Sequence, residues 1–238
     1  MSFNPAYEKA LSTPRFDAYR QRARNDDDLA WALYRWNQDL VSTANSLGAD
    51  LEVTLRNTID FHLARHFGRP DWWASPTLVL DQNTDKAIGS KSTKYQSAIA
   101  SGAAGPGRVI SDLMFGTWVN LLSTGGKTAS GKRVDYEMNL WRPAISAGFT
   151  TGVKKDGTPR RPTRVDVHKR ASNFKALRNR MAHHEPIIDG AAPPGGNRLA
   201  LLQIWDQGLD LLTWMCPELG DHHRSANTLP ALYSQRPG

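Results

Sequence analysis

The sequence predicts an all-α protein, a bundle of about five main helices with a long basic loop before one of them. Apolar residues recur at helical spacing in several segments, and glycine or proline residues separate these segments. The sequence shows neither the alternation typical of strands nor an internal repeat. Because the apolar helices fall at both ends of the chain, we expect one domain over 1–238, with its core over about 26–216 and a partly ordered tail over 217–238.

The first two amphipathic helices are predicted within residues 26–47 and 47–68. Three successive Asp residues suit the N-terminus of the first, and Gly68 is a stop signal for the second. The apolar residues that predict the first helix are Leu29, Leu33, Trp36, Leu40 and Val41. Those that predict the second are Leu51, Leu55, Ile59, Leu63 and Phe67, each four residues from the next.

In the middle of the chain the sequence predicts a turn or a short 3₁₀-helix at "PDWW", a polar helix over 81–102 and an apolar helix over 107–126. Residues 127–164 are rich in Gly, Pro, Thr and charge, which indicates a long loop with short helical turns near 134–148. A further helix follows over 163–184, and a strongly apolar one ends the core. The residues expected in apolar packing are Val167, Phe174, Leu177 and Met181 on the helix over 163–184, together with Trp118, Trp141 and Trp205.

The single cysteine, Cys216, indicates a reducing compartment, because one thiol allows neither an internal disulfide nor a cysteine-rich metal site. The N-terminus lacks the basic and apolar regions of a signal peptide, and no apolar run reaches the roughly 20 residues of a membrane span. We therefore expect a soluble, cytoplasmic protein.

The net charge of +7 is confined to one segment. Residues 151–185 contain ten Lys or Arg and three acidic residues, whereas the rest of the chain is balanced. Clustered positive charge is typical of a protein with a polyanionic partner, although a solvated basic loop would have the same composition. Because this segment overlaps a motif that contains histidines, we favour nucleic acid as the partner.

That motif is "KALRNRMAHHEPII", residues 175–188. Asn179 and His183 are four residues apart and share a helix face, with Arg178 one position before Asn179. Pro186 disfavours helical geometry at the residue before it, so the helix should end near His184. An Arg, an Asn and a His should thus project together at a helix end.

This set suits cleavage of RNA, whose 2′-OH is a built-in nucleophile. A histidine can move the protons, and an arginine can stabilise the charge on the phosphorane. Two other interpretations remain. The arginines could simply suit the negative end of the helix dipole, or His183, His184 and Glu185 could bind a metal with help from 221–223. Neighbouring residues on a helix point about 100° apart, which makes a poor chelate.

The stretch "LRNRMAHHEPI" resembles the signature of the Abi-like family of HEPN domains, in which an Arg, usually an Asn and then a His follow one another. The blocks "LYRWNQDL", "LEVTLRNTID", "ISDLMFGTWVNLL" and "LWRPAI" also resemble that family, in the same order. The resemblance runs from about residue 28 to about 215. It implies an all-α HEPN bundle, a homodimer with the two motifs facing across a cleft, and a metal-independent endoribonuclease without a cofactor.

Carried over by this resemblance, Arg178 and His183 match the catalytic pair, and Asn179 matches the polar residue after the Arg. We expect His184, Arg180 and Glu185 beside them to support the site or bind substrate. Further supporting or substrate-binding candidates are Glu52, Arg56 and Arg142. Glu52 and Arg56 could instead form an ordinary salt bridge, and Arg142 could be structural.

Toxin or abortive-infection (antiphage) activity is the expected role, with RNA as substrate and an antitoxin or a phage-derived trigger as a further partner. Family members silenced by an AMP-adding antitoxin carry a Tyr two residues after the motif His. Glu185 occupies that position here, which argues against that mode of control. The main rival is a non-catalytic dimeric module that binds RNA or protein. A DNA-binding regulator is a third class, for which the sequence offers no helix-turn-helix pattern.

Overall fold

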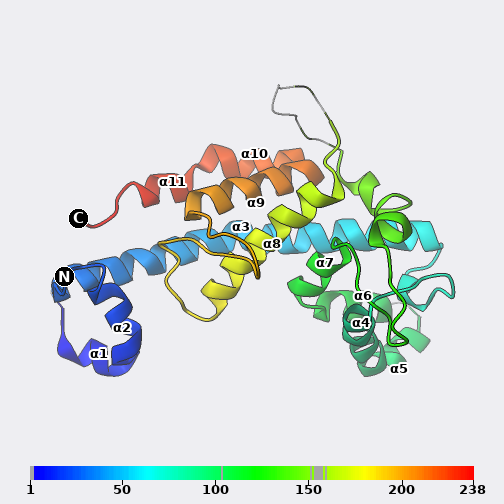
Figure 1. Ribbon diagram of the computed structural model, residues 1–238, viewed down its shortest axis with the longest axis horizontal. Coiled ribbons are helices and arrows are strands. Elements are labelled where there is room, and N and C mark those ends of the chain that lie inside the picture. Colours follow the sequence, from blue (N-terminus) through cyan, green and yellow to red (C-terminus); the bar gives the residue numbers. More distant parts are fainter. Residues whose placement is uncertain (1–2, 103, 151, 153–157, 159) are drawn as a thin grey trace. The chain divides into compact units, whose positions relative to one another are not determined.

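The computed structural model describes residues 3–102, 104–150, 152, 158 and 160–238, and within them the protein is all-α, as predicted (Figure 1). These residues form no strand, and only two isolated bridges, Lys127–Arg133 and Ala191–Leu199, occur among them. The α-helices are α1 (Pro5–Leu11), α2 (Thr13–Arg20), α3 (Asp27–Phe67), α4 (Gln82–Lys94), α5 (Gln96–Ala100), α6 (Gly105–Asp112), α7 (Phe115–Leu121), α8 (Arg164–Ala182), α9 (Leu201–Met215), α10 (Pro217–Ala226) and α11 (Thr228–Tyr233). The short turns are η1 (Trp72–Ala74), η2 (Glu137–Trp141) and η3 (Ile145–Gly148).

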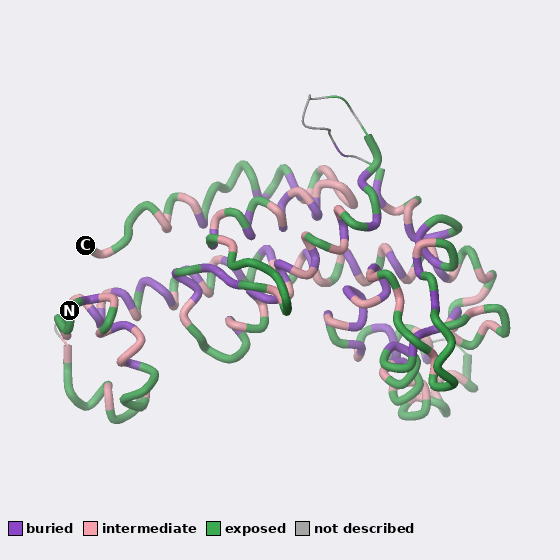
Figure 2. Tube along the Cα trace, in the orientation of Figure 1, coloured by how far each residue is buried: buried purple, intermediate pink, exposed green. Residues whose placement is uncertain are grey.

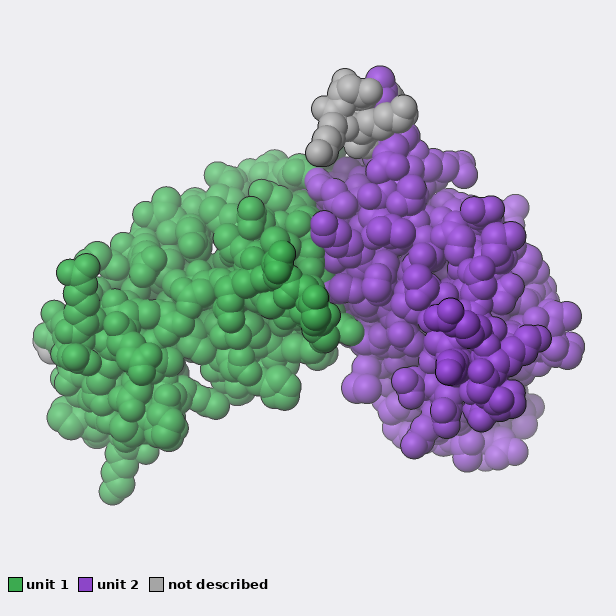
Figure 3. Space-filling model, viewed as in Figure 1, with its two compact units in different colours: residues 1–49, 173–209, 221–238 green, residues 50–172, 210–220 purple. Residues whose placement is uncertain are grey.

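The chain divides into two compact units, and each is assembled from segments that lie far apart in the sequence (Figure 3). Unit 1 comprises residues 1–49, 173–209 and 221–238, and unit 2 comprises residues 50–172 and 210–220. The boundaries between these segments fall inside α3, α8, α9 and α10. Single helices therefore contribute residues to both units.

The two helices predicted within 26–68 are one helix, α3, of 41 residues. Gly48 lies inside it, where a glycine costs roughly 1 kcal/mol relative to alanine but does not break the helix. A Cβ there would lie 3.5 Å from the ring of Phe174, and the apolar stripe continues past it through the fully buried Leu47 and Leu51. The predicted stop is correct, because Gly68 has a φ of +68° directly after the last helical residue.

Unit 1 contains α2, the N-terminal parts of α3 and α9 and the C-terminal part of α8, around a core that includes Phe16, Leu40, Leu177 and Trp205. Within the tail over 217–238, residues 217–226 form α10 and residues 228–233 form α11. The Trp36 indole N–H donates to the Leu232 carbonyl oxygen at 2.9 Å, a contact 196 residues apart in sequence that local patterns do not reveal.

Unit 2 contains the remaining predicted elements. The polar helix over 81–102 is divided into α4 and α5, and the apolar helix over 107–126 into α6 and α7, because Leu113 and Met114 adopt extended backbone. The short turns predicted near 134–148 and at "PDWW" are present as η2, η3 and η1.

The predicted core residues are buried, and buried and exposed positions alternate along the helices (Figure 2). Each of the following is at most 5% exposed: Val167, Phe174, Leu177, Met181, Trp118, Trp141 and Trp205. None of the described helices combines the length and the hydropathy needed to cross a membrane.

Candidate active site

The C-terminal end of α8 presents the motif in unit 1. His183 donates its backbone N–H to the carbonyl oxygen of Asn179 at 3.0 Å, which closes the last turn and places the two residues on one face. The side chains of Asn179 and His183 are exposed, and Arg178 is half-buried. Leu177 and Met181 point into the core on the opposite side. The local packing therefore forces the polar set of the motif towards solvent.

The helix ends in a Schellman motif whose left-handed residue is His184. The Glu185 N–H donates to the Arg180 carbonyl oxygen at 2.9 Å, and the His184 N–H donates to the Met181 carbonyl oxygen at 3.1 Å. His184 has a φ of +56°, a conformation that glycine normally supplies at this position. The last helical residue is Ala182, two residues before the end expected from Pro186.

Arg180 binds the segment that follows the helix. Its Nε and Nη2 donate to the Pro186 carbonyl oxygen at 3.0 and 2.8 Å, and its Nη1 lies 3.2 Å from Glu185 Oε2. The positive charge of Arg180 also acts to lower the pKa of Tyr19, a buried residue of α2. Burial and the neighbouring Tyr34 raise the pKa of Tyr19 to about 12, and the charges of Arg22, Arg15 and Arg180 oppose that rise.

Two residues that sequence reasoning missed also hold this segment. Asn37 of α3 is 1% exposed, and its Oδ1 accepts the Ile187 N–H at 2.8 Å. Arg22 forms an ion pair with Asp189, with Nε 3.2 Å from Oδ2. A signal for Asn37 was present, because it lies four residues after Leu33 and three before Leu40, on the apolar face of the helix.

Glu52, Arg56 and Arg142 belong to unit 2, whereas the motif residues from Arg178 to Glu185 belong to unit 1. Glu52 and Arg56 are both half-buried on α3, and Arg56 Nε donates to Asn57 Oδ1 at 3.3 Å. Burial raises the pKa of Asp60, one helix turn further on, while a hydrogen bond from the Trp72 indole and the charge of Arg56 act against it. The pairing of Glu52 with Arg56 stays a prediction.

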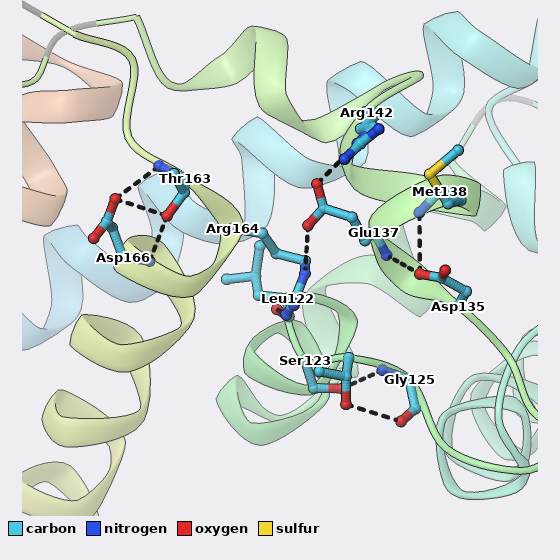
Figure 4. A network of polar contacts seen from close by, with 11 residues as sticks. Leu122, Ser123, Gly125, Asp135, Glu137, Met138, Arg142, Thr163, Arg164 and Asp166 are labelled. Carbon is cyan, nitrogen blue, oxygen red and sulfur yellow. Dashed lines mark hydrogen bonds and ion pairs between the residues drawn. The ribbon is translucent and has the colours of Figure 1, made fainter.

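Arg142 shares a carboxylate with a buried arginine (Figure 4). Its Nε donates to Glu137 Oε1 at 3.1 Å, while Arg164 Nε donates to Glu137 Oε2 at 2.9 Å. Arg164 also donates to the Leu122 carbonyl oxygen at 2.9 Å, and its side chain is only 8% exposed. Arg164 therefore joins the residue that follows α7, η2 and the start of α8, although the sequence suggested only that it was part of a basic segment.

A pocket of about 540 Å³ lies in unit 2 and contains none of the predicted site residues. It is lined by Thr124, Gly125, Arg133, Val134, Asp135 and Arg164. Asp135 already accepts from the backbone N–H groups of Glu137 and Met138, and Arg164 is neutralised by Glu137. Two of the three charged side chains that line this pocket, Asp135 and Arg164, are therefore already engaged within the protein.

Metal-binding geometry is absent from the described part of the chain, where no three His, Cys, Asp or Glu side chains gather closely enough to hold an ion. Lys154 and Lys155 of the basic segment lie outside the described residues. No protein-family model, curated protein or solved structure matches this chain.

Proposed function

We propose that the protein is a metal-independent endoribonuclease with Arg178, Asn179 and His183 as its site. The observation that carries the proposal is the exposed Asn179–His183 face at the end of α8, beside the half-buried Arg178. The core of unit 1 fixes this face, because Leu177 and Met181, on the opposite side of the same helix turns, are buried in that core. The resemblance of the sequence to HEPN domains supports the same assignment.

In the proposed reaction the 2′-oxygen of a ribose attacks the adjacent phosphorus. The 2′-O–P bond forms, the P–O5′ bond breaks, and the products are a 2′,3′-cyclic phosphate and a 5′-OH. The proton of the 2′-OH leaves, and the 5′-oxygen gains one, so no water is consumed in this step. Imidazole exchanges protons between about pH 5 and 8, which suits His183 to this transfer.

Arg178 and Asn179 would act on the phosphate. A guanidinium can bind two phosphate oxygens and stabilise the charge that accumulates in the phosphorane. The Asn179 amide, on the same face as His183, can donate to a phosphate oxygen or orient the imidazole. The excess of positive charge in residues 151–185 would attract the RNA.

The test compares cleavage of RNA by the wild type, His183→Ala and His66→Ala in the presence of a chelator. His66 is a matched control, because it is also an exposed histidine in the last turn of a helix. Loss of a general acid or base lowers rates by about 100- to 10,000-fold, so only the His183→Ala rate should fall. Equal cleavage by both variants would refute the mechanism.

Toxin or antiphage action rests on the family resemblance and is tested in cells. Expression of the wild type should arrest growth and create new 5′-OH ends, and His183→Ala should do neither. Salt-sensitive RNA binding without cleavage by the wild type would identify the rival, a non-catalytic binding module. Light scattering of the purified protein tests the proposed homodimer.

A further inference from the structure

The segment that follows the motif helix is held at nearly every position. Glu185 bonds to Arg180 through its backbone, the Pro186 carbonyl accepts two hydrogen bonds from Arg180, and the Ile187 N–H donates to Asn37. Asp189 forms an ion pair with Arg22. The segment thus begins with the exposed His184 and Glu185 and is held at the buried Ile187, which indicates that its shape matters for the histidines beside it.

Arg180 makes the largest share of these contacts. Three of its guanidinium nitrogens are engaged inside the protein, two with one carbonyl oxygen and one with the Glu185 carboxylate. A guanidinium used in this way is already oriented by protein groups, and moving it onto a phosphate would break these bonds. Lys175, one and a half turns earlier on the same helix, forms no ion pair with any described residue.

His184 shows what the fixed turn imposes. A non-glycine residue in left-handed backbone is strained and persists only where its surroundings enforce it. Here the two Schellman hydrogen bonds enforce it from the helix side, and Arg180 and Asn37 enforce it from the side of the following residues. The same turn fixes the backbone beside His183 and so sets the direction in which the His183 side chain points.

We propose that Arg180 is a positioning residue, which holds the turn over residues 184–187 and thereby orients the two motif histidines. Its role differs from that of Arg178, since Arg180 acts through the Pro186 carbonyl and Glu185 rather than on the substrate. The expected effect on catalysis rests on the proposed nuclease function. The expected effect on the turn does not depend on it.

The kinetic test uses Arg180→Lys and Arg180→Gln, with Lys175→Gln as the control for loss of one positive charge from the same helix. Misplacement of a catalytic group lowers the rate by about 10- to 100-fold, so both Arg180 variants should lose kcat with little change in KM. Lys175→Gln should leave kcat unchanged and affect at most KM. An unchanged kcat in Arg180→Lys, with an active wild type, would overturn the inference and leave the nuclease intact.

The structural test uses NMR and needs no substrate. In both Arg180 variants the ring signals of His183 and His184 should shift, and exchange of the Glu185 and Ile187 amide hydrogens should become at least about tenfold faster as the turn opens. The indole signal of Trp205, a buried residue of the same unit as Arg180, serves as the check on folding. Unchanged histidine signals and exchange would overturn the inference, as would global unfolding of both variants, which would make Arg180 a residue of general stability.

Discussion

Tyr136 and Asp81, which are 55 residues apart in sequence, exchange two hydrogen bonds in the interior of unit 2. The Tyr136 hydroxyl donates to Asp81 Oδ2 at 2.5 Å and accepts from the Asp81 backbone N–H at 3.0 Å. The same carboxylate caps α4 by accepting from the N–H groups of Asn83 and Thr84. One buried carboxylate thus joins the start of α4 to the loop before η2.

Replacing Tyr136 with phenylalanine should destabilise unit 2. The change leaves the buried Asp81 N–H without an acceptor, which costs about 1–3 kcal/mol. Urea unfolding of Tyr136→Phe measures this cost. Tyr7→Phe, at an exposed tyrosine, is the control and should change the free energy of unfolding by no more than about 0.5 kcal/mol. Equal stability of the two variants would contradict the structural role of the Tyr136 hydroxyl.

Asp81 should make unit 2 sensitive to acid. Burial alone would raise the pKa of Asp81, but hydrogen bonds from Tyr136, Thr84 and backbone N–H groups outweigh it, and the pKa lies below its ordinary value. A carboxyl group with a depressed pKa in the folded state contributes stability above its unfolded pKa of about 4 and loses it as the pH falls further. The difference in unfolding free energy between the wild type and Asp81→Asn should therefore shrink between about pH 5 and pH 3. A difference that stays constant over this interval would exclude the linkage.

The two arginines that share Glu137 should differ in their importance. Arg164→Met removes a buried donor to both Glu137 and the Leu122 carbonyl and should cost about 2–4 kcal/mol. Arg142→Ala removes a side chain that is 64% exposed and should cost at most about 1 kcal/mol. Thermal unfolding of both variants measures the difference. Similar losses would show that burial does not distinguish the two ion pairs.

His184→Gly should stabilise unit 1. Relief of left-handed backbone at a non-glycine residue gains about 1–2 kcal/mol, and the greater freedom of glycine in the unfolded chain offsets about 0.5–1 kcal/mol of this. The net gain, between about 0 and 1.5 kcal/mol, is measured by chemical unfolding. His183→Gly, at a residue outside the left-handed region, should give no gain.

The sequence predicted the helical class and the buried side of the motif helix because both depend on local periodicity. Val167, Phe174, Leu177 and Met181 follow one face of α8, and all are buried. The same periodicity runs from Leu47 to Leu51 across Gly48, yet the two predicted helices meet at that point, within α3. One glycine inside a continuous apolar stripe weakens a helix without ending it.

The candidate site was predicted only as a set of residues. Pro186 predicted a helix end near His184, but the left-handed conformation of a histidine at that position follows from contacts with the rest of unit 1. Arg180 and Arg164 belonged to one basic segment in the sequence. Their acceptors, the carbonyl oxygens of Pro186 and Leu122, carry no sequence signal.

The discontinuous make-up of the two units has a consequence for synthesis on the ribosome. Unit 1 needs residues 173–209 before its first 49 residues can bury their apolar side chains, and unit 2 needs residues 210–220. Contacts between such distant segments form slowly, because the intervening chain must be closed into a loop first. A nascent chain that has only reached α7 therefore exposes most of α3 to chaperones. The motif helix α8 emerges after α7, and α9, which completes the core of unit 1, emerges later still. The motif would therefore become ordered only when translation is nearly complete.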